Sequence, residues 1–418
     1  MTSENTRLDS KQESKDIGLF FVMVLLYLMH NSVPVVGYYM PSIVYLGIFG
    51  ILFLLSLSAF YRKMAYTILG FFCVNLIDIL MSVDSISGVA MQGYGMLQGY
   101  LYGLLAVMLI TRYSPKHSRR MIFAFLLMIV VTCVSTIIGN EKYTQPSRLL
   151  ATLSNDDVLF QRYTKENIGG FAMAYVIAFL VPLIVYMIRK QRIPLVLAIG
   201  MLVLFGMTLL SMEYGMAVML FIASLMLLFM PKLTTRKIIF FLIAGVLILL
   251  LFGNAIATLI DIISESIERV TLSERFQAVA DMLRGQDTLS AQAAQNRSFL
   301  YAQSWETFWN SSLLGAWGDE SLGEIGGHSF VLDTMGQYGL LGIVAISVLF
   351  GSMYKVMLAP YKKLECYPYF LWIYLMNIVM LVLNPVQHAD ICLFIVPIFG
   401  YGFGILEQSD TTKHTMKA

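Results

Sequence analysis

The sequence predicts an all-α protein that crosses a lipid membrane about twelve times. Of its 418 residues, 58% are hydrophobic and 13% are charged, whereas a soluble domain carries about 25% charged residues. The apolar residues come in runs near the roughly 20 residues that a helix needs to span a bilayer. Lysine and arginine are concentrated in alternate loops between these runs. This distribution is typical of multi-pass membrane proteins, whose short cytoplasmic loops are enriched in basic residues. This composition excludes a water-soluble enzyme.

Twelve apolar runs, separated by polar or helix-breaking residues, are the predicted spans. They cover residues 17–33, 42–60, 64–83, 94–111, 121–138, 170–188, 193–210, 213–230, 238–260, 328–354, 367–383 and 389–406. No small-residue cleavage site follows the first run, so we interpret it as an uncleaved signal anchor. The polar tails 1–16 and 407–418 lie outside the spans.

The distribution of basic residues predicts the orientation of these spans. Five short loops hold fifteen basic residues: Arg62, Lys63, Arg112, Lys116, Arg119, Arg120, Arg189, Lys190, Arg192, Lys232, Arg236, Lys237, Lys355, Lys362 and Lys363. The loops 34–41, 84–93, 211–212 and 384–388 hold none. Because short cytoplasmic loops retain positive charge, we expect both termini in the cytoplasm. The net charge of +2, spread in small groups, gives no reason to expect a nucleic-acid partner.

Two longer loops divide the spans into the blocks 17–138, 170–260 and 328–406. Residues 139–169 form the first loop and residues 261–327 the second, both extracytoplasmic in this topology. Long loops between spans commonly carry function. The second loop contains four arginines and no lysine, which favours bidentate binding of phosphate or carboxylate. A solvated cap with interfacial anchors is the alternative interpretation of this loop.

Amphipathic helices are predicted inside the second loop. Between Asp261 and Leu283, apolar residues recur every three to six positions, which suits helices lying on the membrane face. The stretch from Asn296 to Trp309 has the same character, and Trp305 belongs to its aromatic interfacial face. The region 261–327 is therefore expected to be a folded loop that carries catalysis.

Two glycine-containing segments follow these helices. Residues 312–318 place Gly315 and Gly318 in a turn where the backbone can approach a ligand closely. Gly326 and Gly327 then precede His328 and a long apolar run. The positive end of a helix dipole favours a neutral imidazole, which is the form that accepts a proton. We therefore select His328 as a candidate catalytic base, against the alternative of an ordinary interfacial histidine.

About fifty residues in this region resemble the O-antigen polymerase and ligase superfamily. The shared features are, in order, an arginine, an aromatic helix, a glycine turn, a histidine pair and a helix with spaced glycines. Here they are Asn296-Arg297, Trp305, Leu313-Leu-Gly315-Ala-Trp-Gly318, Gly327-His328-Ser329-Phe330-Val331-Leu332 and Gly336-Gln-Tyr-Gly339-Leu-Leu-Gly342. The order, the spacing, the side of the membrane and the number of spans agree together. The rest of the chain agrees only in hydropathy.

The resemblance implies a metal-independent glycosyltransferase with no cofactor. Its donor would be a polyprenyl-diphosphate-linked oligosaccharide at the outer face of a bacterial cytoplasmic membrane. By analogy, Arg297 would hold the diphosphate and stabilise the leaving oxygen, and His328 would orient or deprotonate the attacking hydroxyl. A flippase and a chain-length regulator are candidate partners besides the bilayer. The product would be a capsule, an O-antigen or an exopolysaccharide.

The chain departs from the family pattern before the eighth span. Relatives carry an arginine in a turn there, where this sequence has Ser211-Met-Glu213-Tyr-Gly215. Arg269 or Arg275 is the preferred replacement for this second phosphate clamp. The first-loop residues Arg148 and Arg162 are expected to be solvated charges. The alternative is that Glu213 contacts a sugar hydroxyl, because a carboxylate beside two apolar spans is costly without a partner.

The remaining polar and small residues receive structural interpretations. Asp333, five residues past His328, is expected either to face another side or to orient the site. Gly336, Gly339 and Gly342 predict a smooth stripe for close helix packing. Glu324 and His328 have metal-like spacing, but the intervening glycines argue against a helix there, so no metal site is predicted. The four cysteines are interpreted as packing residues.

Polymerase activity is the leading functional hypothesis. A ligase that transfers finished glycan to a different acceptor shares the donor chemistry and stays open. A flippase for the same lipid-linked oligosaccharide is the alternative without catalysis. A transporter would place charged residues and broken helices near the bilayer midplane, whereas this chain concentrates arginine and histidine in one outer loop.

Overall fold

The computed structural model describes most of the chain. The described residues are 18–30, 32–57, 69, 76, 86–150, 153, 156–230, 234–266, 273, 276–277, 280, 289–317, 320–383 and 391–404. The predicted span 64–83 and both tails lie outside this set, apart from the single residues 69 and 76.

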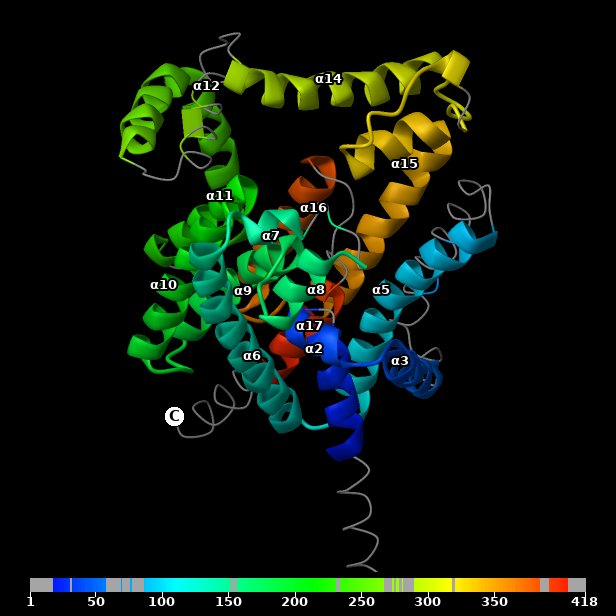
Figure 1. Cartoon of the computed structure of the whole chain (residues 1–418), viewed down its shortest axis with the longest axis vertical. Helices are drawn as coiled ribbons and strands as arrows, with labels where there is room; N and C mark the ends of the chain where they lie inside the picture. The colour runs from blue at the N-terminus through cyan, green and yellow to red at the C-terminus, as the bar shows by residue number, and fades with distance from the viewer. Residues whose placement is uncertain are drawn as a thin grey trace, which may run out of the picture.

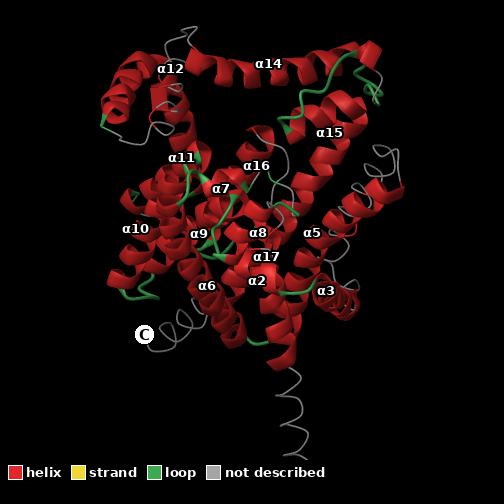
Figure 2. Cartoon of the chain, in the orientation of Figure 1, coloured by secondary structure: helices red, strands yellow, loops and turns green. Residues whose placement is uncertain are grey.

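Helices form the architecture, and the described residues contain no strand (Figure 2). After a helix over Gly18–His30, the chain forms α2 (Pro34–Tyr39), α3 (Ser42–Ser56), α5 (Ile86–Arg112), α6 (Pro115–Lys142), α7 (Pro146–Leu149), α8 (Val158–Lys165), α9 (Phe171–Arg189), α10 (Leu195–Met212), α11 (Gly215–Leu225), η2 (Met226–Phe229), α12 (Thr235–Glu265), α14 (Leu289–Asn310), η3 (Glu320–Leu322), α15 (Phe330–Met357), η4 (Ala359–Tyr361), α16 (Tyr367–Leu383), α17 (Cys392–Phe399) and the π-helix η6 (Gly400–Gly404).

Four helices in the described part of the chain are long and apolar enough to cross a membrane: Pro115–Lys142, Phe171–Arg189, Leu195–Met212 and Phe330–Tyr361. Shorter apolar helices occupy most of the other predicted runs. The run 367–383 coincides with α16. In contrast, α12 continues to Glu265, past the predicted start of the second loop at 261, and is bent at Phe252.

Helix α9 forms the centre of the bundle. Every side chain from Met173 to Met187 is buried, because its surface is apolar on all sides and neighbouring helices cover it. Helices α10, α11 and α16 pack directly against it. Cys133, Cys366 and Cys392 are free and buried, as expected for packing residues, and Cys73 lies outside the described residues.

The outer helices expose apolar side chains that a soluble protein would bury. On α10 these are Leu195, Val196, Leu197, Ile199, Val203, Met207 and Leu210. A continuous exposed apolar face of this kind requires an apolar environment. The long apolar helices and their exposed apolar side chains therefore indicate a membrane protein.

Among the described residues, contacts connect several of the basic loops with neighbouring segments at one end of the bundle, and two of the loops without basic residues with the first long loop. At the first end, which we call the basic end, Lys190 forms an ion pair with Glu365. There Arg189 also donates to the carbonyl oxygens of Leu227 and Leu228 at 2.8 and 2.9 Å, which satisfies helix-terminal acceptors. Tyr401 likewise donates to Tyr113 O at 2.6 Å.

At the second end, which we call the opposite end, two of the loops that lack basic residues meet the first long loop. Val35 N–H donates to Asn167 Oδ1 at 3.2 Å, and Asn140 Nδ2 donates to Ser211 Oγ at 3.3 Å. Helix α6 joins the two ends, because it begins beside Tyr113 and ends beside Tyr143. Its 28 residues extend about 42 Å, at about 1.5 Å per residue, which is enough to cross a bilayer.

The predicted smooth glycine stripe of α15 is wrong at Gly339. This residue has φ 56° and ψ −131°, which interrupts the helix. A side chain at such a backbone conformation is strained, so glycine is required here. The interruption divides α15 into a first part, residues 330–338, and a second part, residues 340–357. Figure 1 shows α14 across the top of the view with α15 beneath it.

The segment 313–317 supplies the hydrogen bonds that the interruption removes from α15. The N–H groups of Ala316 and Trp317 donate to the carbonyl oxygens of Gly336 and Gln337 at 3.1 and 3.0 Å. Across the interruption, Leu340 N–H donates to Leu313 O at 3.2 Å. Since unpaired backbone groups are costly in a membrane protein, this segment and the broken helix depend on each other.

Candidate functional site

The candidate site is built on α14, the first part of α15 and the described residues between them, 311–317 and 320–329. We call these three segments together the hairpin. Helices α14 and α15 pack against each other. Gly336 allows this approach, because a Cβ there would lie 2.7 Å from the carbonyl oxygen of Ser304. The predicted close packing is confirmed at this glycine.

A polar stripe on α14 fixes the loop that precedes α15. Gln303 Nε2 donates to Glu324 Oε2 at 2.8 Å, and Thr307 Oγ1 donates to the carbonyl oxygen of Glu324 at 2.7 Å. One turn further, Asn310 Nδ2 donates to Leu322 O at 3.0 Å. Residues 303, 307 and 310 share one helix face because they are three and four positions apart. The loop is therefore attached to α14 at several points.

Ser304 connects α14 to both the loop and α15. It is completely buried, and its hydroxyl donates to Asp333 Oδ1 at 2.6 Å while accepting from Gly326 N–H at 2.9 Å. The second carboxylate oxygen of Asp333 accepts from Ser329 N–H at 3.0 Å. Of the two predicted roles of Asp333, the structure supports the orienting one.

Ser329 begins α15 and fixes the position of His328. The Ser329 hydroxyl oxygen accepts a hydrogen bond from Leu332 N–H at 3.1 Å. In return, the N–H of Ser329 donates to the Asp333 carboxylate. This reciprocal arrangement resembles a capping box and satisfies two orphan donors at the helix start. His328 therefore lies immediately before the helix N-terminus, as predicted. Hydrogen bonds from Gly326 N–H to Ser304 and from Ser329 N–H to Asp333 hold the backbone on both sides of it.

The ring of His328 is exposed and oriented by its neighbour. Its Nδ1 lies 2.9 Å from the carbonyl oxygen of Gly327. A carbonyl oxygen only accepts, so Nδ1 carries the hydrogen of this bond. In the neutral ring, Nε2 is then the atom with the lone pair. The arrangement presents a proton acceptor at the surface of the hairpin.

Gly326 allows the loop to lie against α14. A Cβ at this position would lie 2.0 Å from the carbonyl oxygen of Leu300, a backbone atom that cannot move aside. We expect Gly326→Ala to lower the free energy of unfolding by about 2 kcal/mol, as for an overpacked site. The neighbouring Gly327→Ala is the matched control: its Cβ meets open space, but φ is +72°, so the cost is about 1 kcal/mol.

The measurement for this pair is the rate at which a cysteine introduced at Glu324 reacts with a soluble thiol reagent. Gly326→Ala is expected to increase this rate, because the loop separates from α14, whereas Gly327→Ala leaves it near that of the parent. Equal rates in the two variants would show that Gly326 does not hold the loop.

The predicted arginines occupy different parts of the chain. Arg297 lies in α14, two turns before Ser304 and within the same helix. Arg297 therefore belongs to the first helix of the hairpin. Arg269 and Arg275 lie outside the described residues, as do most of residues 267–288, where an amphipathic helix was predicted.

Trp305 lies on a face of α14 different from that of the polar stripe. It is 42% exposed, and Trp309 is 62% exposed. Their rings meet edge to face at 5.6 Å between centroids, and Phe308 packs against both. The predicted aromatic face is therefore present, with Phe308 itself buried.

The close neighbour of Gly315 is the interrupted helix α15, and its approach to a ligand stays a prediction. A Cβ at Gly315 would lie 2.2 Å from the carbonyl oxygen of Gln337, so the close neighbour is α15 of the same chain. Gly318, the second glycine of this turn, lies outside the described residues. Residues 313–317 of this segment form hydrogen bonds with the backbone of α15 at its interruption.

Glu213 lies at the corner between α10 and α11. It is 6% exposed, and its Oε2 has no hydrogen-bond partner among the described residues. Beside it, Tyr214 donates to the carbonyl oxygen of Ser147 at 2.8 Å, and Asn140 Nδ2 donates to Ser147 Oγ at 3.0 Å. A buried carboxylate oxygen without a partner is costly, which makes Glu213 a candidate ligand-binding group.

The first-loop arginines differ from each other. Arg162 lies 3.7 Å from Glu166 and over the ring of Tyr143, and is 54% exposed, as expected for a solvated charge. A hydrogen bond from Tyr143, followed by Lys142, keeps the pKa of Glu166 below its usual value. Arg148 is half-buried in α7, next to Ser147.

The sequence interpretation missed the polar stripe and Ser304. The available signal was the spacing of Gln303, Thr307 and Asn310 on the helix face away from Trp305. Such a stripe resembles the solvated side of any amphipathic helix. Its bonding role arises only when residues 320–329 fold back over it.

No protein-family model matches this chain, and no curated protein sequence matches it either.

Proposed function

We propose that this chain is a polysaccharide polymerase that joins polyprenyl-diphosphate-linked oligosaccharide units at the outer face of a bacterial cytoplasmic membrane. The observation that carries the proposal is the geometry of His328. Its Nδ1 is held by the Gly327 carbonyl oxygen, so an exposed Nε2 is available as a base. The polymer would be a capsule, an O-antigen or an exopolysaccharide.

The proposed reaction is a direct glycosyl transfer. The acceptor hydroxyl oxygen forms a bond to the anomeric carbon of the donor sugar, and the bond from that carbon to the diphosphate oxygen breaks. His328 Nε2 takes the hydroxyl proton and returns it to solvent. Polyprenyl diphosphate leaves with the bonding electrons. A base positioned in this way contributes about 10²–10⁴ to a rate.

Arg297 is the proposed partner of the leaving diphosphate. A guanidinium binds phosphate oxygens in a bidentate manner and stabilises charge that develops on them. Its place in α14, the helix attached to the His328 loop, supports this role. Arg269 or Arg275 would supply the second contact, since the Ser211–Gly215 turn has no arginine.

Glu213 and Trp305 are the proposed sugar-binding residues. The buried oxygen of Glu213 lacks a partner among the described residues, and a sugar hydroxyl would satisfy it. The exposed ring of Trp305 can cover an apolar sugar face or anchor α14 at the membrane surface.

We also propose twelve spans, with both termini cytoplasmic and residues 261–327 forming the outer catalytic loop. The grouping of loops at the basic end and the opposite end supports this topology. Positively charged short loops are retained in the cytoplasm, which would place the basic end there. A flippase that delivers the donor and a chain-length regulator are the proposed partners.

Analysis of the surface glycans of a deletion strain tests this function. If the chain is a polymerase, the strain is expected to carry single repeat units on the normal acceptor. Free lipid-linked polymer would instead identify a ligase, because polymer formation would then be intact. Accumulation of repeat units only on the cytoplasmic side would identify a flippase and contradict the proposal.

A further inference from the structure

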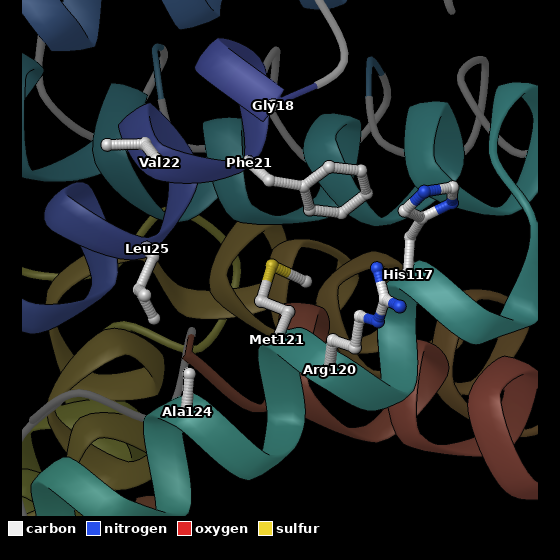
Figure 3. A pocket seen from close by; sticks show the side chains of 8 residues that line it. All are labelled: Gly18, Phe21, Val22, Leu25, His117, Arg120, Met121 and Ala124. Atoms are coloured by element: carbon white, nitrogen blue, oxygen red, sulfur yellow. The ribbon is translucent and has the colours of Figure 1, made fainter. Parts of the chain in front are cut away.

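A groove lies between the helix Gly18–His30 and the start of α6, far along the chain from the hairpin (Figure 3). Its volume is about 350 Å³, at the lower end of the about 300–1,000 Å³ of ordinary ligand pockets. Phe21, Val22 and Leu25 form one wall, and Met121 and Ala124 form the other. The greater part of the lining is therefore apolar.

One end of the groove is polar and basic. Figure 3 shows the Arg120 guanidinium and the His117 ring together at the end away from Leu25 and Ala124. The His117 ring stacks on Phe21 at 5.2 Å between centroids, and its Nδ1 lies 2.9 Å from Ser114 Oγ. These contacts position the imidazole as part of the wall.

The segment of the chain that supplies this end is basic. Residues 112–120 contain Arg112, Lys116, Arg119 and Arg120 but no aspartate or glutamate. Arg120 is exposed and makes no ion pair with any described residue. Lys116 is exposed one helical turn earlier, on the same face of α6. An anionic group would complement this end.

The groove also lies at one end of a candidate membrane-spanning helix. Helix α6 begins at Pro115 and is one of the helices able to cross a membrane, so residues 117–120 lie at the end of a candidate span. Basic residues at such a boundary attract anionic lipids, each contributing about 1 kcal/mol. An apolar groove with a basic end matches a molecule that has an acyl chain and an anionic headgroup.

We propose that this groove binds one anionic phospholipid, with its phosphate at Arg120 and Lys116 and part of an acyl chain between the helix Gly18–His30 and α6. The inference rests on neither the hairpin nor the proposed glycosyl transfer. It adds a lipid site at the basic end of the bundle, where the lipid would join the first helix to α6.

Native mass spectrometry of the full-length purified protein, titrated with phosphatidylglycerol or phosphatidylcholine, tests this site. The wild type is expected to bind one phosphatidylglycerol more tightly than phosphatidylcholine. Arg120→Gln is expected to weaken phosphatidylglycerol binding about fivefold, which corresponds to the loss of one basic contact, and to leave phosphatidylcholine binding unchanged. Arg236→Gln, which changes an exposed arginine at the start of α12, is the matched control and should match the wild type.

A second pair of variants tests the apolar part. Ala124→Phe fills the groove and is expected to weaken phosphatidylglycerol binding at least fivefold, whereas Leu127→Phe, at an exposed position on the same helix, should not. Equal binding of the two lipids, equal effects of Arg120→Gln and Arg236→Gln, or full competition by inorganic phosphate alone would overturn the proposal.

Discussion

Replacing His328 with glutamine is expected to reduce the rate of polymer formation about 10²- to 10⁴-fold, the usual contribution of a general base. Glutamine keeps a polar side chain at this exposed position but has no lone pair basic enough to accept the hydroxyl proton. Because Ser329 and Asp333 hold the backbone beside it, the fold should persist. The rate is measured from the growth of a polymer ladder on lipid-linked repeat units.

Glu324→Gln is the matched control for this variant. Glu324 is exposed in the same loop, and its side chain accepts a hydrogen bond from Gln303. Glutamine can still accept that bond through its carbonyl oxygen. The ladder should therefore form at the parental rate, and an equal loss in both variants would indicate disruption of the loop rather than removal of a base.

Replacing Gly339 with alanine is expected to lower the free energy of unfolding by about 3 kcal/mol, from backbone strain together with overpacking. The φ of 56° disfavours a side chain, and a Cβ would lie 2.6 Å from Gly315 N and 2.7 Å from Ser312 O. The variant must therefore displace the segment that caps the interrupted helix. Denaturation of the purified protein in a titration with SDS measures the change.

Gly351→Ala provides the control within the same helix. A Cβ at Gly351 meets nothing within 4 Å, and alanine favours helix by up to about 1 kcal/mol over glycine. Its stability should equal or slightly exceed that of the parent. If Gly339→Ala unfolds at the same SDS concentration as Gly351→Ala, the interruption of α15 is not required.

The helical fold was predictable because its signal is local. An apolar run bounded by polar or helix-breaking residues predicts a helix directly, and α16 has the predicted bounds of 367–383. The interruption at Gly339 was not predictable in this way. Glycines at three-residue spacing occur both in closely packed helices and in broken ones, and the difference here depends on the segment 313–317, which lies more than twenty residues earlier.

The candidate site was predictable only in part. The position of His328 followed from two glycines and the apolar run after them. The partners that fix it did not, because Ser304 and Thr307 have the sequence pattern of a solvated helix face and become buried only when the loop folds over them. Glu213 was selected from its place beside two apolar spans, since a lone carboxylate there is costly. That its Oε2 has no hydrogen-bond partner among the described residues became apparent only in the structure.

The most direct test is reconstitution of the purified protein in liposomes with a lipid-linked repeat unit as the sole substrate. Wild-type protein is expected to produce a ladder of lipid-linked polymers, and His328→Gln protein with the same helical content is expected to produce almost none. A ladder that grows at the wild-type rate in the His328→Gln protein would contradict the role of His328. No ladder from the wild type would contradict the polymerase itself.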